Sequence, residues 1–114
     1  MIDARTRLLL EDMLVYARHA EDYIAGLTPE IFAQTYVMIH AATRAVEVVG
    51  EAASQIPADI RQMMPTIPWR QAIDMRNKVI HGYRSLQPNT LYQTIRDDFP
   101  PLIAEIERIL NSGA

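Results

Sequence analysis

Residues 28–56 read TPEIFAQTYVMIHAATRAVEVVGEAASQI, and this stretch decides the fold class. It opens with Thr28 as a helix N-cap, Pro29 at the first helical position and Glu30, whose charge suits the positive end of a helix. Apolar residues then recur at helical rather than alternating spacing, so we expect one long helix from Thr28 to about Ile56. Almost every other window of the chain has the same period. The sequence therefore predicts an all-α protein.

The predicted helix is apolar on two sides when its residues are placed about 100° apart. The first side holds Phe32, Ile39, Ala42, Val46, Val49 and Ala53, and the second holds Val37, Ala41, Val48 and Ala52. A helix with two apolar faces needs two neighbours, one of which is the chain's own bundle. The other is either a second copy of the chain, giving a homodimer through the long helices, or a crowded monomeric core.

The flanking sequence predicts further helical segments. Gly26 and Gly82 are expected stop signals, and Pro57, Pro65 and Pro68 leave only a short helical turn between two longer helices. We expect Pro100-Pro101 to bend or restart the last helix. The sequence thus predicts a bundle of about four to five helices in a single domain spanning residues 1–114. The predicted segments are residues 3–25, 28–56, 58–64, 68–82 and 88–110.

Composition narrows the possible functions. The chain has 114 residues and no cysteine, so disulfides and thiolate chemistry are excluded. Neither an apolar leader nor a run of about 18 apolar residues occurs, which predicts a soluble cytoplasmic protein without a membrane partner. A net charge of −3 argues against a general nucleic-acid coat. Residues 70–84 nevertheless carry four cations against one carboxylate, which fits either a short RNA contact or ordinary surface.

That basic segment contains the octet RNKVIHGY at residues 76–83. Arginine can hold a phosphate bidentately, and histidine titrates near neutral pH. On a helical projection Arg76 falls in the middle of an apolar face, where a guanidinium must find an anion. The anion is a carboxylate of the protein, from Glu47, Glu51 or a second copy, or a substrate phosphate, and a partly buried arginine can meet both.

Three more polar groups of the octet accompany Arg76. Asn77 and His81 are four residues apart, so the amide could orient the imidazole, or His81 could simply cap the helix. Tyr83 follows the helix stop. It is either the fourth polar group of the site or a side chain packed beneath the helix end. A polar stripe in the long helix, His40, Arg44, Glu47 and Glu51, either pairs with itself on the helix surface or supports this site.

Other catalytic chemistries have little support in the sequence. The three histidines, His19, His40 and His81, show no metal-binding spacing. No serine lies in an elbow motif, and the glycines are isolated rather than gathered in a phosphate loop. An enzyme with this sequence is therefore expected to need no metal and no cofactor, and to rely on acid–base and electrostatic terms.

Three segments resemble the HepT-like branch of the HEPN superfamily. They are VGEA at residues 49–52, IPWR at residues 67–70 and the octet, which fits the family pattern Arg-x-x-x-x-His-x-Tyr. The resemblance runs from about Ile39 to Leu110. It implies a HEPN-type helical bundle and a homodimer that brings two motif helices together at a cleft.

The resemblance also implies a function, namely a metal-independent endoribonuclease that acts as the toxin of a type VII-like toxin–antitoxin system. Arg76 would bind the scissile phosphate of RNA, Asn77 would position groups, and His81 would act as the general acid–base catalyst. The implied partner is a minimal nucleotidyltransferase antitoxin of the MntA-like type, which would adenylylate Tyr83. The expected supporting residues are Glu47, Glu51 and Lys78. The alternative is a non-catalytic, nucleotide-binding subunit of a nucleotidyltransferase complex, with Arg76 in a structural ion pair.

Overall fold

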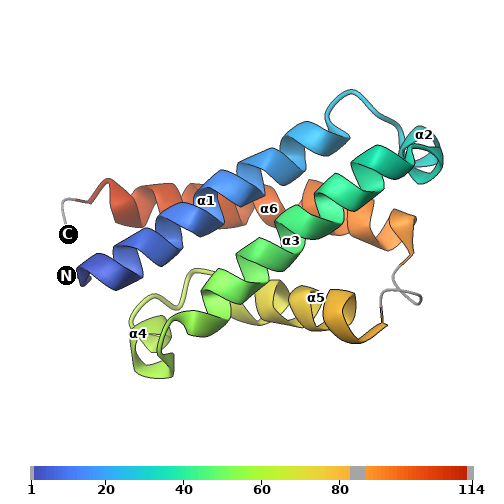
Figure 1. Ribbon diagram of the computed structural model, residues 1–114. Helices are drawn as coiled ribbons and strands as arrows, with labels where there is room; N and C mark the ends of the chain where they lie inside the picture. The colour runs from blue at the N-terminus through green and yellow to red at the C-terminus, as the bar shows by residue number, and fades with distance from the viewer. Residues whose placement is uncertain (1, 83–86, 113–114) are drawn as a thin grey trace.

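The computed structural model describes residues 2–82 and 87–112, with the backbone alone at residues 80–82. Within these residues the chain forms six helices and no strand (Figure 1). The prediction of an all-α protein is confirmed. The helices are α1 (Ala4–Ile24), α2 (Pro29–Gln34), α3 (Tyr36–Gln55), α4 (Ala58–Gln62), α5 (Trp69–Gly82) and α6 (Pro88–Leu110).

The helix expected over residues 28–56 is in fact two helices. α2 begins as predicted, since the Thr28 hydroxyl accepts a hydrogen bond from the backbone N–H of Ile31 at 3.2 Å. It ends at Thr35, whose φ of −107° and ψ of 82° leave the helical region. The Thr35 hydroxyl donates to the Ile31 carbonyl at 2.7 Å, a side-chain bond that competes with helix continuation. This break adds one helix to the four to five expected.

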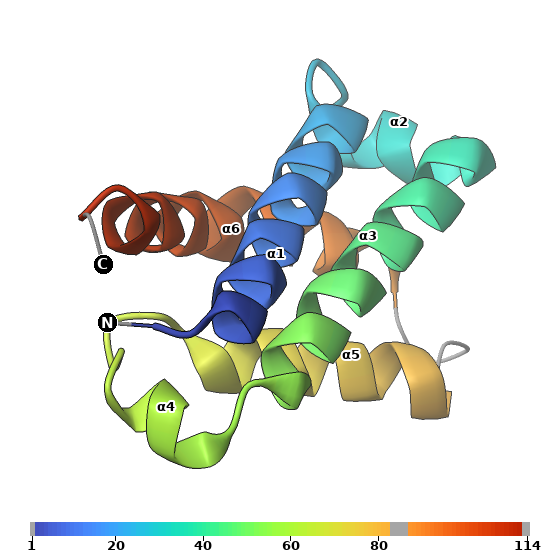
Figure 2. The ribbon, with the colours of Figure 1, turned by 60° about the vertical axis from the view of Figure 1, so that its left-hand side comes forward.

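α3 lies at the centre of the arrangement. α1 packs along one side of it and α5 along another, while α6 packs behind α1 (Figures 1 and 2). The first apolar face of α3 is buried as predicted, including Ala42, Val46, Val49 and Ala53. These side chains join residues of α1 and α6 in one hydrophobic core, such as Leu10, Met13, Leu91, Ile95 and Ile106.

The second apolar face of α3 is divided along its length. Near the C-terminal end of the helix Ala52 is buried, and α1 of the same chain supplies the neighbour. At the N-terminal end Val37 is 74% exposed and the adjacent Tyr36 is 71% exposed. One face of α3 is thus covered within the chain only in part.

α6 runs without interruption through Pro100 and Pro101, so the last helix does not restart there. Two prolines remove two backbone donors, yet the surrounding residues Phe99, Leu102 and Ile103 are buried in the core. Their burial holds the segment in the helical conformation. Among the described residues, no helix combines the length and apolar character needed to cross a membrane.

Candidate functional site

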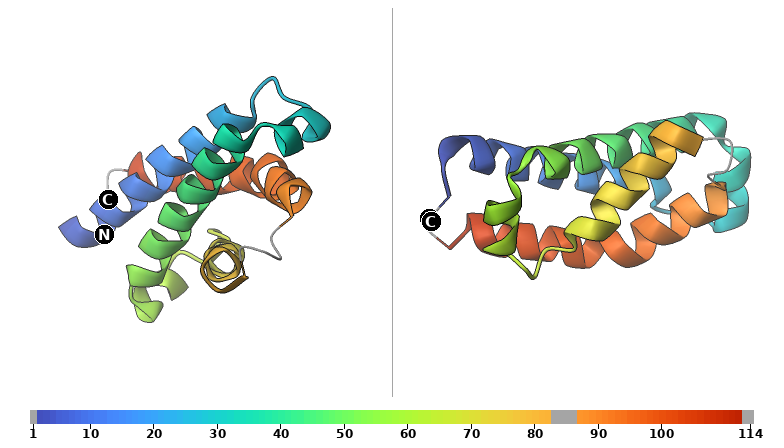
Figure 3. Two further views of the ribbon diagram at one scale, coloured as in Figure 1. Left: turned by 45° about the vertical axis from the view of Figure 1, so that its right-hand side comes forward. Right: turned by 90° about the horizontal axis from the view of Figure 1, so that it is seen from below.

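α5 carries the described part of the octet and packs across α3; the left panel of Figure 3 views α5 nearly end-on beneath α3. Its start is fixed by Trp69, whose indole N–H donates to the carbonyls of Arg61 at 3.2 Å and Met64 at 3.0 Å. Ala72, Met75 and Val79 form its buried face. The connection through α4 therefore sets where α5 begins and which face it turns toward α3.

The two helices come into close contact at Gly50. A Cβ atom at Gly50 would lie 2.1 Å from the Cβ of Arg76 and 2.7 Å from the carbonyl oxygen of Ala72, far inside van der Waals contact. Only a residue without a side chain fits, so Gly50 fixes the distance between α3 and Arg76. Sequence reasoning assigned this glycine no role. The sequence does hold a clue to that role: a glycine inside a helix destabilises the helix by about 0.5–1 kcal/mol, so its presence there calls for a structural reason.

Arg76 is held by residues on both helices. Its Nη2 donates to Glu51 Oε2 at 2.6 Å, and its Nη1 donates to Asn77 Oδ1 at 3.1 Å. Nε is buried and meets no acceptor among the described residues. The side chain of Arg76 is 26% exposed and that of Glu51 is 46% exposed. Of the anions that the sequence left open for Arg76, the structure shows the carboxylate of Glu51.

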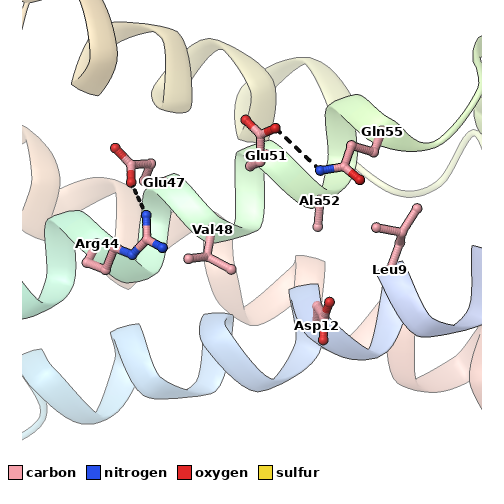
Figure 4. Close-up of a pocket in the computed structure, with 8 residues that line it drawn as sticks. All are labelled: Leu9, Asp12, Arg44, Glu47, Val48, Glu51, Ala52 and Gln55. Carbon is pink, nitrogen blue, oxygen red and sulfur yellow. Dashed lines mark hydrogen bonds and ion pairs between the residues drawn. The ribbon is translucent and has the colours of Figure 1, made fainter.

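Further hydrogen bonds link this ion pair to α1. Gln55 Nε2 donates to the other carboxylate oxygen, Glu51 Oε1, at 3.3 Å, and Arg5 Nη2 donates to Gln55 Oε1 at 3.4 Å. Glu51 and Gln55 also line a groove of about 460 Å³ between α1 and α3 (Figure 4). The remaining lining residues are Leu9, Asp12, Arg44, Glu47, Val48 and Ala52.

The other two expected supporting residues do not reach Arg76. Glu47 forms an ion pair with Arg44 within α3, as the polar stripe predicted. Lys78 is two positions from Arg76 and therefore lies on the opposite side of α5. There it lines a separate cavity of about 190 Å³, with Asp74 and Asp98. Of the three expected supporting residues, the structure brings only Glu51 into contact with Arg76.

The sequence matches a protein family described as ribonuclease HepT-like, over residues 13–109. The chain belongs to this family. It is 33% identical to "Probable ribonuclease HepT" of Thermococcus cleftensis, over 88% of the chain and 91% of that protein. It is 32% identical to a "Putative RNase" of Methanocaldococcus jannaschii, over 91% of the chain and 86% of that protein. No solved structure matches the chain significantly. The resemblance inferred from three short segments is thereby confirmed.

Two residues of the HepT-like signature fall beyond the described geometry. The backbone of α5 continues through His81 and Gly82, which places His81 one helical turn after Asn77. The side chain of His81, and with it the expected contact to Asn77, lies outside the described residues. Tyr83 lies outside them as well. The geometry of the site is therefore that of Arg76, Asn77 and Glu51.

The arrangement around Arg76 is suited to binding an anion. A guanidinium has five N–H donors, and the two described hydrogen bonds use two of them. The side chain is partly buried, which strengthens its electrostatic interactions relative to those of a solvated arginine. Glu51 is the only described ion-pair partner of Arg76 and is itself half exposed, so an incoming anion can reach the pair from solvent.

Proposed function

We propose that this HepT-like protein is a metal-independent endoribonuclease and the toxin of a toxin–antitoxin pair. The observation that carries the proposal is the placement of Arg76, a partly buried guanidinium that keeps free donors and precedes His81 on the same helix. Family membership and the names of the relatives support RNA as the substrate. That support reaches as far as an RNA-cleaving enzyme, and the role as a toxin goes beyond it.

The proposed reaction uses a nucleophile from the RNA itself. The ribose 2′-oxygen attacks the neighbouring phosphorus, its proton passes to the imidazole of His81, and a bond forms between the 2′-oxygen and phosphorus. The bond from phosphorus to the 5′-oxygen of the next nucleotide breaks, and the leaving oxygen takes up a proton from water, to which His81 returns its own. Arg76 stabilises the negative charge that grows on the phosphoryl oxygens, and Asn77 holds the guanidinium. The products are a 2′,3′-cyclic phosphate and a free 5′-hydroxyl.

The test is cleavage of an RNA oligonucleotide and of the same oligonucleotide with 2′-deoxyribose at the cleaved position. We expect cleavage of the first, in the presence of EDTA as in its absence, and none of the second, because the nucleophile is missing. Mass spectrometry of the fragments should show the cyclic phosphate. Cleavage of the deoxy-substituted substrate, or loss of activity in EDTA that added metal restores, contradicts the mechanism.

The proposal includes a homodimer that brings two copies of α5 together. The exposed pair Tyr36 and Val37 at the start of α3 supports it, since large apolar side chains at that exposure favour a partner surface. Light scattering should give a mass of about 26 kDa, twice the 13.0 kDa of the chain. A mass of one chain at all concentrations would remove the shared cleft from the mechanism.

The proposed regulator is a minimal nucleotidyltransferase that adenylylates Tyr83. The added phosphate would place negative charge close in sequence to His81 and Arg76 and so repel the RNA backbone. Mass spectrometry of the peptide that contains Tyr83, after incubation with the nucleotidyltransferase and ATP, tests this step. An unmodified Tyr83 after incubation with the enzyme encoded beside this gene would remove it.

One observation favours a second candidate function. Arg76 is already paired with Glu51, as expected if the arginine is structural and the chain is a non-catalytic, nucleotide-binding subunit of a nucleotidyltransferase complex. The two candidates differ in the cleavage assay described above. RNA left intact by the wild-type protein, together with a stable complex with the nucleotidyltransferase, would favour the second.

A further inference from the structure

The ion pair between Glu51 and Arg76 has a consequence for the ribonuclease reaction, on which the inference rests. We infer that Glu51 is a positioning residue, which orients the Arg76 guanidinium for the transition state and at the same time weakens its hold on the substrate phosphate. Glu51 acts only through Arg76 and does not itself touch the reacting atoms.

Glu51 is fixed more firmly than an ordinary surface carboxylate. Its Oε2 accepts from Arg76 at 2.6 Å, and its Oε1 accepts from Gln55 at 3.3 Å. The preceding residue, Gly50, brings the backbone of α3 against Arg76. Both ends of the ion pair are therefore anchored, on α3 for the carboxylate and on α5 for the guanidinium.

The other terminal nitrogen of the guanidinium, Nη1, donates to Asn77 Oδ1 at 3.1 Å. Glu51 and Asn77 together fix the plane in which the remaining N–H groups point, and Nε is buried away from any described acceptor. A planar donor held at two points loses little conformational entropy when it binds a phosphate. Orientation of this kind contributes to the rate of a step only if it is kept in the transition state.

The negative charge of Glu51 has a second effect, on binding. It neutralises part of the charge of Arg76 in the free enzyme and lies close to where a phosphate would approach. Removal of the carboxylate leaves Arg76 with its full charge and more freedom, so the ground-state complex with RNA should bind at least as tightly. The transition state, which needs the fixed orientation, should be stabilised less.

The deciding experiment measures kcat and KM of Glu51→Ala with a cleavable RNA oligonucleotide. We expect kcat to fall by about 10-fold or more, because a misplaced catalytic group costs up to about 10²-fold, while KM stays equal or decreases. Glu51→Gln keeps the shape and one acceptor but loses the charge. It should retain more of kcat than Glu51→Ala and show the same unchanged or lowered KM.

The matched control is Glu107→Ala. Glu107 is also a half-exposed glutamate in an ion pair with an arginine, Arg18, but it joins α6 to α1, far along the chain from α5. This variant should keep the wild-type kcat and KM. Thermal unfolding of all variants shows whether they are equally folded at the assay temperature, and Glu51→Gln provides the kinetic comparison if Glu51→Ala unfolds.

A double substitution shows whether Glu51 acts through Arg76. Arg76→Lys keeps a positive charge without the planar fork, so adding Glu51→Ala to it should lower kcat much less than in the wild type. Wild-type kcat in Glu51→Ala and Glu51→Gln overturns the inference, as does a raised KM with kcat unchanged. Failure of the ribonuclease proposal looks different, because the wild-type protein then leaves the RNA intact.

Discussion

Arg76→Ala is expected to lower the rate of RNA cleavage by about 10²-fold or more, the usual cost of removing a group that stabilises transition-state charge. The substitution removes the one guanidinium that the structure places between α3 and α5 with free donors. Two neighbouring cations are not placed to replace it, since Arg44 is engaged with Glu47 and Lys78 lies on the opposite side of α5. The measurement is the single-turnover rate on an RNA oligonucleotide.

His81→Ala should lower the rate of RNA cleavage by a similar factor, because it removes the proposed general acid–base catalyst. The control for both variants is Arg18→Ala, which deletes an ion-paired arginine on α1 and should leave the rate unchanged. Near-wild-type cleavage by Arg76→Ala would show that phosphate stabilisation comes from elsewhere. Near-wild-type cleavage by His81→Ala would assign the proton transfers to another group.

The loss of cleavage in Arg76→Ala is not expected to come from a loss of folding stability. The ion pair with a half-exposed glutamate contributes less than about 1 kcal/mol. The buried Nε meets no acceptor among the described residues; an unsatisfied donor costs on the order of 1–3 kcal/mol, and the substitution removes that cost. These effects oppose one another, so Arg76→Ala should unfold near the wild-type temperature.

The sequence predicted those features that depend on local chemistry. Thr28 and Pro29 start α2 where capping rules place its first turn, and the apolar period of α3 identified its buried face. Besides the local bond of the Thr35 hydroxyl, the break at Thr35 is accompanied by contacts with α6 that no local pattern reveals. Tyr92 of α6 packs on Phe32 with ring centroids 5.6 Å apart, and its hydroxyl donates to the Leu27 carbonyl at 2.5 Å. These contacts hold α2 and the turn before it against α6.

The site shows the same division between local and tertiary information. Helical projection placed Arg76 on a face that needs an anion, and two carboxylates one turn apart, Glu47 and Glu51, were equally plausible partners. The choice between them follows from how α5 crosses α3, and that crossing depends on the absence of a side chain at Gly50. Periodicity gives the faces of a helix but not the distance between two helices.

Gly50→Ala is therefore expected to have a large effect for a single added methyl group. In an open helix, glycine to alanine stabilises by about 0.5–1 kcal/mol. Here the new Cβ would meet the Cβ of Arg76 at 2.1 Å and the carbonyl oxygen of Ala72 at 2.7 Å, and neither is the end of a flexible side chain. The clash should reverse the sign and destabilise the protein by about 1–3 kcal/mol, as overpacking does. Denaturant unfolding measures this free energy.

The same substitution should abolish most of the cleavage activity in the molecules that remain folded. To relieve the clash α5 must move away from α3, and it carries Arg76 away from Glu51 as it moves. A displacement of about 1 Å at a catalytic group can cost about 10²-fold in rate. Single-turnover cleavage should therefore fall even under conditions in which circular dichroism shows native helix content.

Ala104→Gly is the matched control, because it removes the same methyl group at an exposed position inside α6. It should destabilise by about 0.5–1 kcal/mol through helix propensity alone and leave cleavage unchanged. If Gly50→Ala is as stable as the wild type or more so, α3 and α5 do not approach closely at this position. If it is destabilised but fully active once folded, the spacing of the two helices supports the fold and does not set the position of Arg76.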